Sequence, residues 1–143
     1  MKKGAIAIDH GSKRTGFAAV DALRVAPAPL ETVTGGDAEA LNAMERLLGE
    51  RDVTHVIVGY PLNMDGTRGG RAAEVDRFVE RLRERFPTLV VRLQDERLST
   101  KEAEERLADA GYFGADRKAR RDSWSALVLL EDWIREGEPE GRG

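Results

Sequence analysis

The sequence contains no cysteine among its 143 residues. Disulfides, thiolate nucleophiles and cysteine-ligated zinc are thereby excluded, and the composition suits a reducing compartment. No apolar run approaches the ~18 to 20 residues that a membrane-spanning helix needs. The short apolar run at the N-terminus is interrupted by Asp9 and His10, so it is too brief for the core of a signal peptide. We therefore expect a cytoplasmic protein that is not embedded in a membrane.

A strong net charge is also lacking. The formal net charge is only −3, although 34% of the residues are charged. Any surface that binds nucleic acid must therefore come from a local cluster of basic residues. The length is that of one globular domain. We expect a single domain over residues 1–136, followed by a flexible C-terminal tail over residues 137–143.

The pattern of apolar runs and turn residues predicts an α/β fold. Residues 4–9 and 16–20 predict a β-hairpin, and residues 25–33 predict an edge strand because Pro27 and Pro29 cannot donate to a ladder. Further strands are expected over 55–59 and 89–94, and helices over 37–48, 71–86, 99–110 and 122–135, with a polar loop over 111–121. Ser99 and Glu102 match a capping box. This order predicts a five-stranded mixed sheet, with three antiparallel strands followed by parallel crossovers, flanked by helices.

Two acids follow strands whose carboxyl ends meet at one edge of such a sheet. Asp9 closes the first strand and Glu96 follows the last. If the strand at 55–59 lies between them, their backbones are two strand spacings apart, ~10 Å. Carboxylates at that distance can share Mg²⁺ or Mn²⁺, and two ions about 4 Å apart can promote phosphodiester hydrolysis.

Each acid also has a structural interpretation. Asp9 is adjacent to turn residues, although an acid at the end of a buried strand is costly unless it is paired or metal-bound. Asp95 and Glu96 are neighbours, and only one of them can face the site if the strand continues. Asp122 equally fits an N-cap of the last helix. The residues alone therefore leave the choice between Asp95 and Glu96, and the role of Asp122, open.

Basic residues surround these acids in the sequence. Lys13 and Arg14 lie in the predicted hairpin turn, where they either contact phosphates or are simply solvated. A basic run before Asp122 adjoins a predicted acid, which favours nucleic-acid binding over a solvated surface. The predicted nucleic-acid-binding residues are Lys13, Arg14, Arg68, Arg97, Lys118 and Arg121.

Four segments together resemble the YqgF family, also called RuvX. They are residues 9–16 (DHGSKRTG), 59–66 (GYPLNMDG) and 95–100 (DERLST), followed by Asp122. Members are described as Holliday junction resolvases and as nucleases that process the precursor of 16S ribosomal RNA. The resemblance implies a ribonuclease H-like fold and a metal-dependent nuclease whose catalytic and metal-binding acids are Asp9, Glu96 and Asp122.

The resemblance further implies a site for two Mg²⁺ or Mn²⁺ ions and a substrate of structured RNA, branched DNA or both. Processing of the 5′ end of pre-16S rRNA suits association with ribosomal precursor particles, as a monomer or weak homodimer. A non-catalytic, ribosome-associated factor on the same fold is the alternative. The D-x-G hairpin also opens ATP-binding domains of the actin and sugar-kinase type, but those close two related domains around ATP and this chain supplies one.

Overall fold

In the computed structural model, which describes residues 3–140, five strands form one mixed sheet in the order β3-β2-β1-β4-β5. The strands are β1 (Gly4–His10), β2 (Arg14–Val20), β3 (Ala28–Thr34), β4 (Val53–Tyr60) and β5 (Val90–Asp95). The first three strands are antiparallel, and β4 and β5 run parallel to β1. The predicted fold class is confirmed, including the position of β4 between the two strands that precede Asp9 and Glu96.

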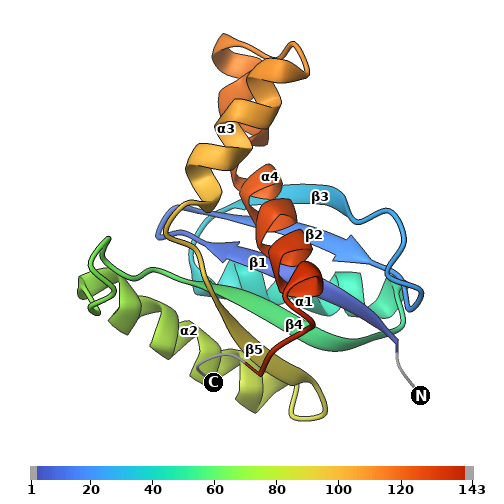
Figure 1. The fold of residues 1–143 in the computed structure, drawn as a ribbon. Helices are drawn as coiled ribbons and strands as arrows, with labels where there is room; N and C mark the ends of the chain where they lie inside the picture. Colours follow the sequence, from blue (N-terminus) through green and yellow to red (C-terminus); the bar gives the residue numbers. More distant parts are fainter. Residues whose placement is uncertain (1–2, 141–143) are drawn as a thin grey trace.

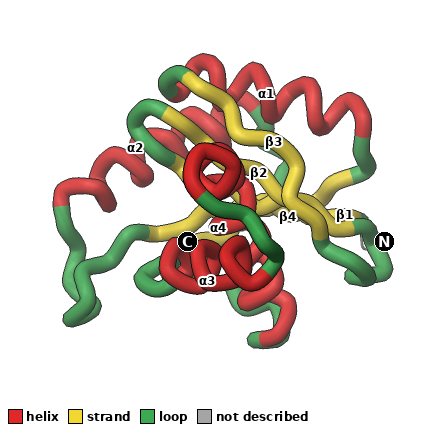
Figure 2. Tube along the Cα trace, turned by 90° about the horizontal axis from the view of Figure 1, so that it is seen from above, coloured by secondary structure: helices red, strands yellow, loops and turns green. Residues whose placement is uncertain are grey.

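Helices cover both faces of this sheet. The helices are α1 (Asp37–Glu50), α2 (Gly70–Arg85), α3 (Ser99–Asp109) and α4 (Gly114–Arg135). Figure 2 shows α1 and α2 on one side of the sheet and α4 on the other, with α3 packed on α4. Figure 1 shows α3 and the first turns of α4 projecting beyond the sheet. We call residues 99–121 the helical arm.

The two faces of the sheet differ in the size of their side chains. The face under α1 and α2 is built from large apolar residues, among them Ile6, Ile8, Phe17, Val56 and Val58. The face under α4 instead carries Ala5, Ala7, Ala18 and Ile57, with glycines at 16 and 59. Small residues on this face let the backbone of α4 lie close to the strands.

Gly16 marks the closest approach of α4 to the sheet. A Cβ atom at Gly16 would lie 2.2 Å from both the carbonyl carbon and the carbonyl oxygen of Asp122. Because real Cβ atoms do not approach backbone so closely, only glycine permits this contact. Gly16 pairs with Asp9 across the β1–β2 ladder, so the same contact brings Asp122 over the end of β1.

The last helix begins earlier than the sequence predicted. Residues 114–121 are helical, so the predicted loop over 111–121 is wrong, as is a helix opening at Asp122. The first turns of α4 pack on α3 rather than on the sheet, and the basic run there therefore shows no apolar stripe. Asp122 lies eight residues after Gly114 and cannot be an N-cap.

The predicted capping box of α3 is also wrong. The N-cap position is Leu98, and no side chain caps the helix. The hydroxyl of Ser99 instead donates to the carbonyl oxygen of Glu96 at 3.0 Å. The start of α3 is thereby tied to the backbone of Glu96.

The last described residues after α4 make specific contacts. Arg24 pairs with Glu138, with 2.9 Å between Nε and Oε2, and the indole of Trp133 donates to the carbonyl oxygen of Pro139. Residues 141–143 of the predicted tail lie outside the described part. Within residues 3–140, no helix is both long and apolar enough to cross a membrane.

We predict that Gly16→Ala destabilises the protein by about 1–3 kcal/mol, because the added methyl group forces α4 away from β2. Urea denaturation monitored by circular dichroism would measure the change. Gly49→Ala is the matched control, since nothing lies within 4 Å of a Cβ atom there and alanine favours the helix. Equal stability of Gly16→Ala and the wild type would contradict the close approach of α4.

Candidate active site

The pleat of β1 places Asp9 on the face under α4. Asp9 follows Ala5 and Ala7 on that face because alternate residues of a strand point the same way. His10 points to the opposite face, where its ring lies 2.7 Å from Asp37 and packs on Phe78. His10 is therefore a structural residue, in agreement with the alternation in the sequence.

The pleat also selects Glu96 over Asp95. The N–H group of Glu96 donates to the carbonyl oxygen of Tyr60 at 3.2 Å, so the ladder between β4 and β5 continues for one residue beyond Asp95. Glu96 therefore shares the α4 face with Gln94. Asp95 points the other way and pairs with Arg97, at 2.9 Å between Oδ2 and Nε.

Gly59 provides the space in which the two acids meet. It is the next residue along β4 after Val58, which pairs with Ile8 of β1. A Cβ atom at Gly59 would lie 2.4 Å from a carboxylate oxygen of Glu96. The missing side chain thus lets Glu96 lie over β4 and hydrogen bond with Asp9.

Like charge and burial change the acidity of this pair. Burial raises the pKa of Asp9 well above its usual value, and the negative charges of Glu96 and Asp122 raise it further, while Arg71 opposes the shift. Burial also raises the pKa of Glu96, against the opposing effects of the hydrogen bond from Asp9 and the charge of Arg71. Both raised pKa values favour the protonated carboxyl groups, and a nearby cation would lower them.

Asp122 approaches the pair from α4. Its charge acts on Asp9, and its carboxylate pairs with Arg14, at 3.0 Å between Oδ2 and Nε. Arg14 was expected in the hairpin turn but opens β2, two residues before Gly16 on the same face. The structure thus brings Asp9 and Glu96 into contact and places Asp122 close enough for its charge to act on Asp9.

The donor set fits a hard divalent cation. Asp9, Glu96 and Asp122 offer only carboxylate oxygens, which Mg²⁺ and Mn²⁺ prefer, and burial, together with the mutual repulsion of their charges, raises the pKa of Asp9. Among residues 3–140, no group of three or more histidine or acidic side chains is already arranged around a common metal position. Asp122 is instead paired with Arg14.

A second arginine, Arg71, also belongs to the site. One guanidinium nitrogen donates to the carbonyl oxygen of His10 at 2.6 Å, and another pairs with Glu74. Its charge acts on both Asp9 and Glu96. Arg71 lies 62 residues from Asp9 in the sequence, in the first turn of α2, so only its contact with His10 at the end of β1 reveals its place.

The predicted basic residues divide between this site and other surfaces. Lys13 and Arg14 line a hollow with Arg71 and Asp122. Lys118 is exposed one turn before Asp122, on the same side of α4. These three basic residues therefore lie on the side of the molecule where Asp122 is found.

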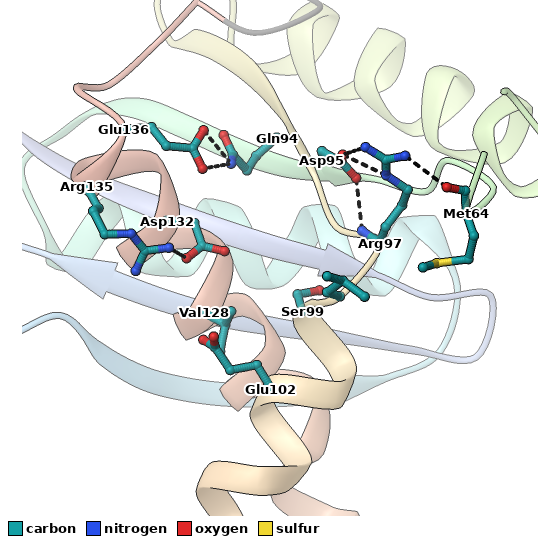
Figure 3. Close-up of a pocket in the computed structure, with 11 residues that line it drawn as sticks. Met64, Gln94, Asp95, Arg97, Ser99, Glu102, Val128, Asp132, Arg135 and Glu136 are labelled. Carbon is teal, nitrogen blue, oxygen red and sulfur yellow. Dashed lines mark hydrogen bonds and ion pairs between the residues drawn. The ribbon is translucent and has the colours of Figure 1, made fainter. Parts of the chain in front are cut away.

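The remaining three predicted residues have other partners. Arg68 faces α2, where it pairs with Asp76 and lies over the ring of Tyr60. Arg121 pairs with Glu104 of α3 at 3.5 Å. Arg97 pairs with Asp95 and donates to the carbonyl oxygen of Met64 at the edge of a cavity of about 530 Å³ (Figure 3). The structure does not bring these three side chains to the acids, and their binding of nucleic acid stays a prediction.

The fold and the site define the class of this protein: a ribonuclease H-like sheet with acids at the ends of β1 and β5 and a third on the last helix. Two solved structures share the fold: RuvC of Thermus thermophilus in complex with a Holliday junction substrate, and Thermus thermophilus RuvC itself. Their TM-scores are 0.57 and 0.53 at 16% and 12% identity, and each match covers 96% of this chain and 98% of the other. Identities this low establish the fold alone.

The sequence identifies the family within that class. The family described as "RuvX: Holliday junction resolvase" matches residues 3–136. A protein of Lachnospira eligens is 38% identical over 133 residues, which cover 90% of this chain and 94% of the relative. A protein of Anaeromyxobacter dehalogenans is 40% identical over 130 residues, with the same two coverages. Both relatives bear the description "Putative pre-16S rRNA nuclease". The chain belongs to the RuvX family of nucleases.

We predict that Asp9→Asn stabilises the metal-free protein at pH 8, because it removes a charge from a crowded, buried pair. A folded-state pKa raised above its unfolded value contributes stability that is lost as the pH rises through the folded value. Asp9→Asn should therefore raise the free energy of unfolding by more at pH 8 than at pH 5. An increase of about 1 kcal/mol would raise Tm by about 2–4 °C.

Thermal unfolding in EDTA would measure this difference. Asp109→Asn, at the exposed end of α3, is the control and should change stability by less than about 0.5 kcal/mol. A lower Tm for Asp9→Asn than for the wild type at pH 8 would argue against the crowded charge.

Proposed function

We propose that this chain hydrolyses phosphodiester bonds in structured nucleic acid, with Mg²⁺ or Mn²⁺ held by Asp9, Glu96 and Asp122. The observation that carries the proposal is the contact between Asp9 and Glu96, with raised pKa values, under the carboxylate of Asp122. Acids without catalytic or metal-binding use rarely gather in this way, because each adds to the cost of burying the others.

Each acid has a distinct part in this proposal. Asp9 lies between the other two, so it is the carboxylate best placed to be shared by two ions. Glu96 approaches across Gly59 and Asp122 across Gly16. A bound pair of divalent ions would supply an activated water and stabilise the charge on the leaving oxygen. Lys13 and Lys118 would hold the nucleic-acid backbone beside the acids through their positive charges.

The proposed substrate is the 5′ end of pre-16S rRNA, a Holliday junction, or both. The descriptions of the curated relatives support the ribosomal RNA precursor, and the description of the family supports the junction. Action on pre-16S rRNA fits association with ribosomal precursor particles in the cytoplasm, as a monomer or a weak homodimer. We also propose that residues 1–136 form a single domain that carries this entire function.

We predict that the purified protein cleaves a pre-16S rRNA fragment or a four-way DNA junction in Mg²⁺ or Mn²⁺ and not in EDTA. Asp9→Asn, Glu96→Gln and Asp122→Asn should each lower the cleavage rate by at least about 100-fold, a loss of about 3 kcal/mol of transition-state stabilisation. Gel analysis of end-labelled substrates would measure rates, and Asp109→Asn is the control.

The same experiment addresses the alternative of a non-catalytic factor. Binding of either nucleic acid by the wild type in EDTA, without cleavage on addition of Mn²⁺ or Mg²⁺, would support a binding module on this fold and contradict the nuclease. The ratio of cleavage rates for RNA and junction identifies the preferred substrate.

A further inference from the structure

A hollow of about 320 Å³ opens beside Asp122. It is lined by Gly11, Ser12, Lys13, Arg14, Arg71 and Asp122. Three of these side chains are cationic and one is anionic, so the hollow favours an anion. Its floor is the β1–β2 turn, where a Cβ atom at Gly11 would lie 2.2 Å from the carbonyl oxygen of Arg14. The turn is thus tightly closed, and Lys13 and Arg14 are held over the hollow rather than displayed on a long loop.

Both arginine side chains are partly accessible to solvent. The Arg14 side chain is 42% exposed and the Arg71 side chain 39%. Arg71 is anchored from below by the carbonyl oxygen of His10 and by Glu74. An anchored arginine loses little conformational freedom on binding, and its planar fork suits two oxygens of one phosphate.

Arg14 contacts the one carboxylate in the hollow. Asp122 is only 19% exposed and accepts from Nε of Arg14. A carboxylate in an ion pair with arginine is a weaker ligand for a metal ion, because the cation already compensates its charge. An anion that enters the hollow competes with Asp122 for Arg14.

We propose that this hollow is a subsite for a phosphodiester of the nucleic-acid backbone, next to the bond that is cut, and that the phosphate takes Arg14 from Asp122. Arg71 holds the entering phosphate, and Asp122 is released toward Asp9 and Glu96. Substrate thereby completes the metal site. The proposal rests on the proposed function for its substrate, but its tests measure binding and not cleavage.

The first test measures Mn²⁺ binding by electron paramagnetic resonance, without nucleic acid. Arg14→Gln should bind Mn²⁺ about 5-fold more tightly than the wild type, since it frees Asp122 from a partly exposed ion pair. Lys13→Gln is the matched control: it removes a positive charge from the same hollow but leaves the pair intact. Equal tightening by Lys13→Gln would mean that net charge alone is responsible and would overturn the role of Arg14.

Dimethyl phosphate serves as a small phosphodiester probe in the same measurement. It should tighten Mn²⁺ binding by the wild type and leave the affinities of Arg14→Gln and Arg71→Gln unchanged. No tightening in the wild type would overturn the exchange of Arg14 between Asp122 and phosphate.

The second test measures binding of fluorescent RNA and of a four-way junction by anisotropy in EDTA, where a metal-dependent nuclease cannot cut. Arg71→Gln should weaken binding about 10-fold, and the dependence of log K on log salt should fall by about 0.7 to 0.9, as expected for one lost phosphate contact. Arg71→Lys, which keeps the charge but not the fork, should retain the slope. Arg46→Gln, on α1 and paired with Glu31, should match the wild type.

An unchanged salt slope in a folded Arg71→Gln variant would overturn the subsite, whether or not the protein cleaves nucleic acid. If Arg71→Gln fails to fold, Arg14→Gln takes its place, and an unchanged salt slope in that variant would do the same. Conversely, if the variants bind with the predicted affinities but the protein shows no metal-dependent cleavage, the subsite stands and the proposed nuclease activity is contradicted.

Discussion

The arrangement of the three acids depends on one contact between backbones, in which α4 touches β2 at Gly16. No side chain separates the helix from the strand there, so Asp122 arrives at the depth of the sheet rather than a layer above it. Gly59 makes the equivalent room for Glu96 on the other side of Asp9. Three acids from three elements converge because two residues between them have no side chain. A small-residue face on the sheet is thus the geometric condition for the site.

Charge opposes the fold at this same place. Asp9 and Glu96 hold raised pKa values because they are buried together, and the nearby arginines compensate only part of their charge. Arg71, which is held by the carbonyl oxygen of His10, lies on the α2 side of the pair. Arg14 forms an ion pair with Asp122. Active sites commonly retain such local conflict because the groups that destabilise the free protein bind its cation or substrate.

The sequence predicted the sheet and Asp9 from strand patterns, because buried strands and their ends leave clear periodic signals. It could not choose between Asp95 and Glu96, since the choice depends on one additional ladder bond, from Glu96 to Tyr60. The early start of α4 was missed because its first turns pack on α3 and lack the apolar stripe of a helix on a sheet. The contact of Arg71 with His10 could not be predicted because it joins distant segments, and no local pattern encodes it.

The continuous course of α4 has a mechanical consequence. The helix runs unbroken for 22 residues from Gly114 to Arg135, about 33 Å at 1.5 Å per residue. Its first turns belong to the projecting arm (Figure 1), and Asp122 lies where the helix reaches the sheet at Gly16. The arm and the third acid therefore belong to one stiff rod, and its contact with Gly16 lies at Asp122 itself. A load on the arm would turn the rod about that contact, so the backbone of Asp122 would keep its place while the direction of its side chain changed.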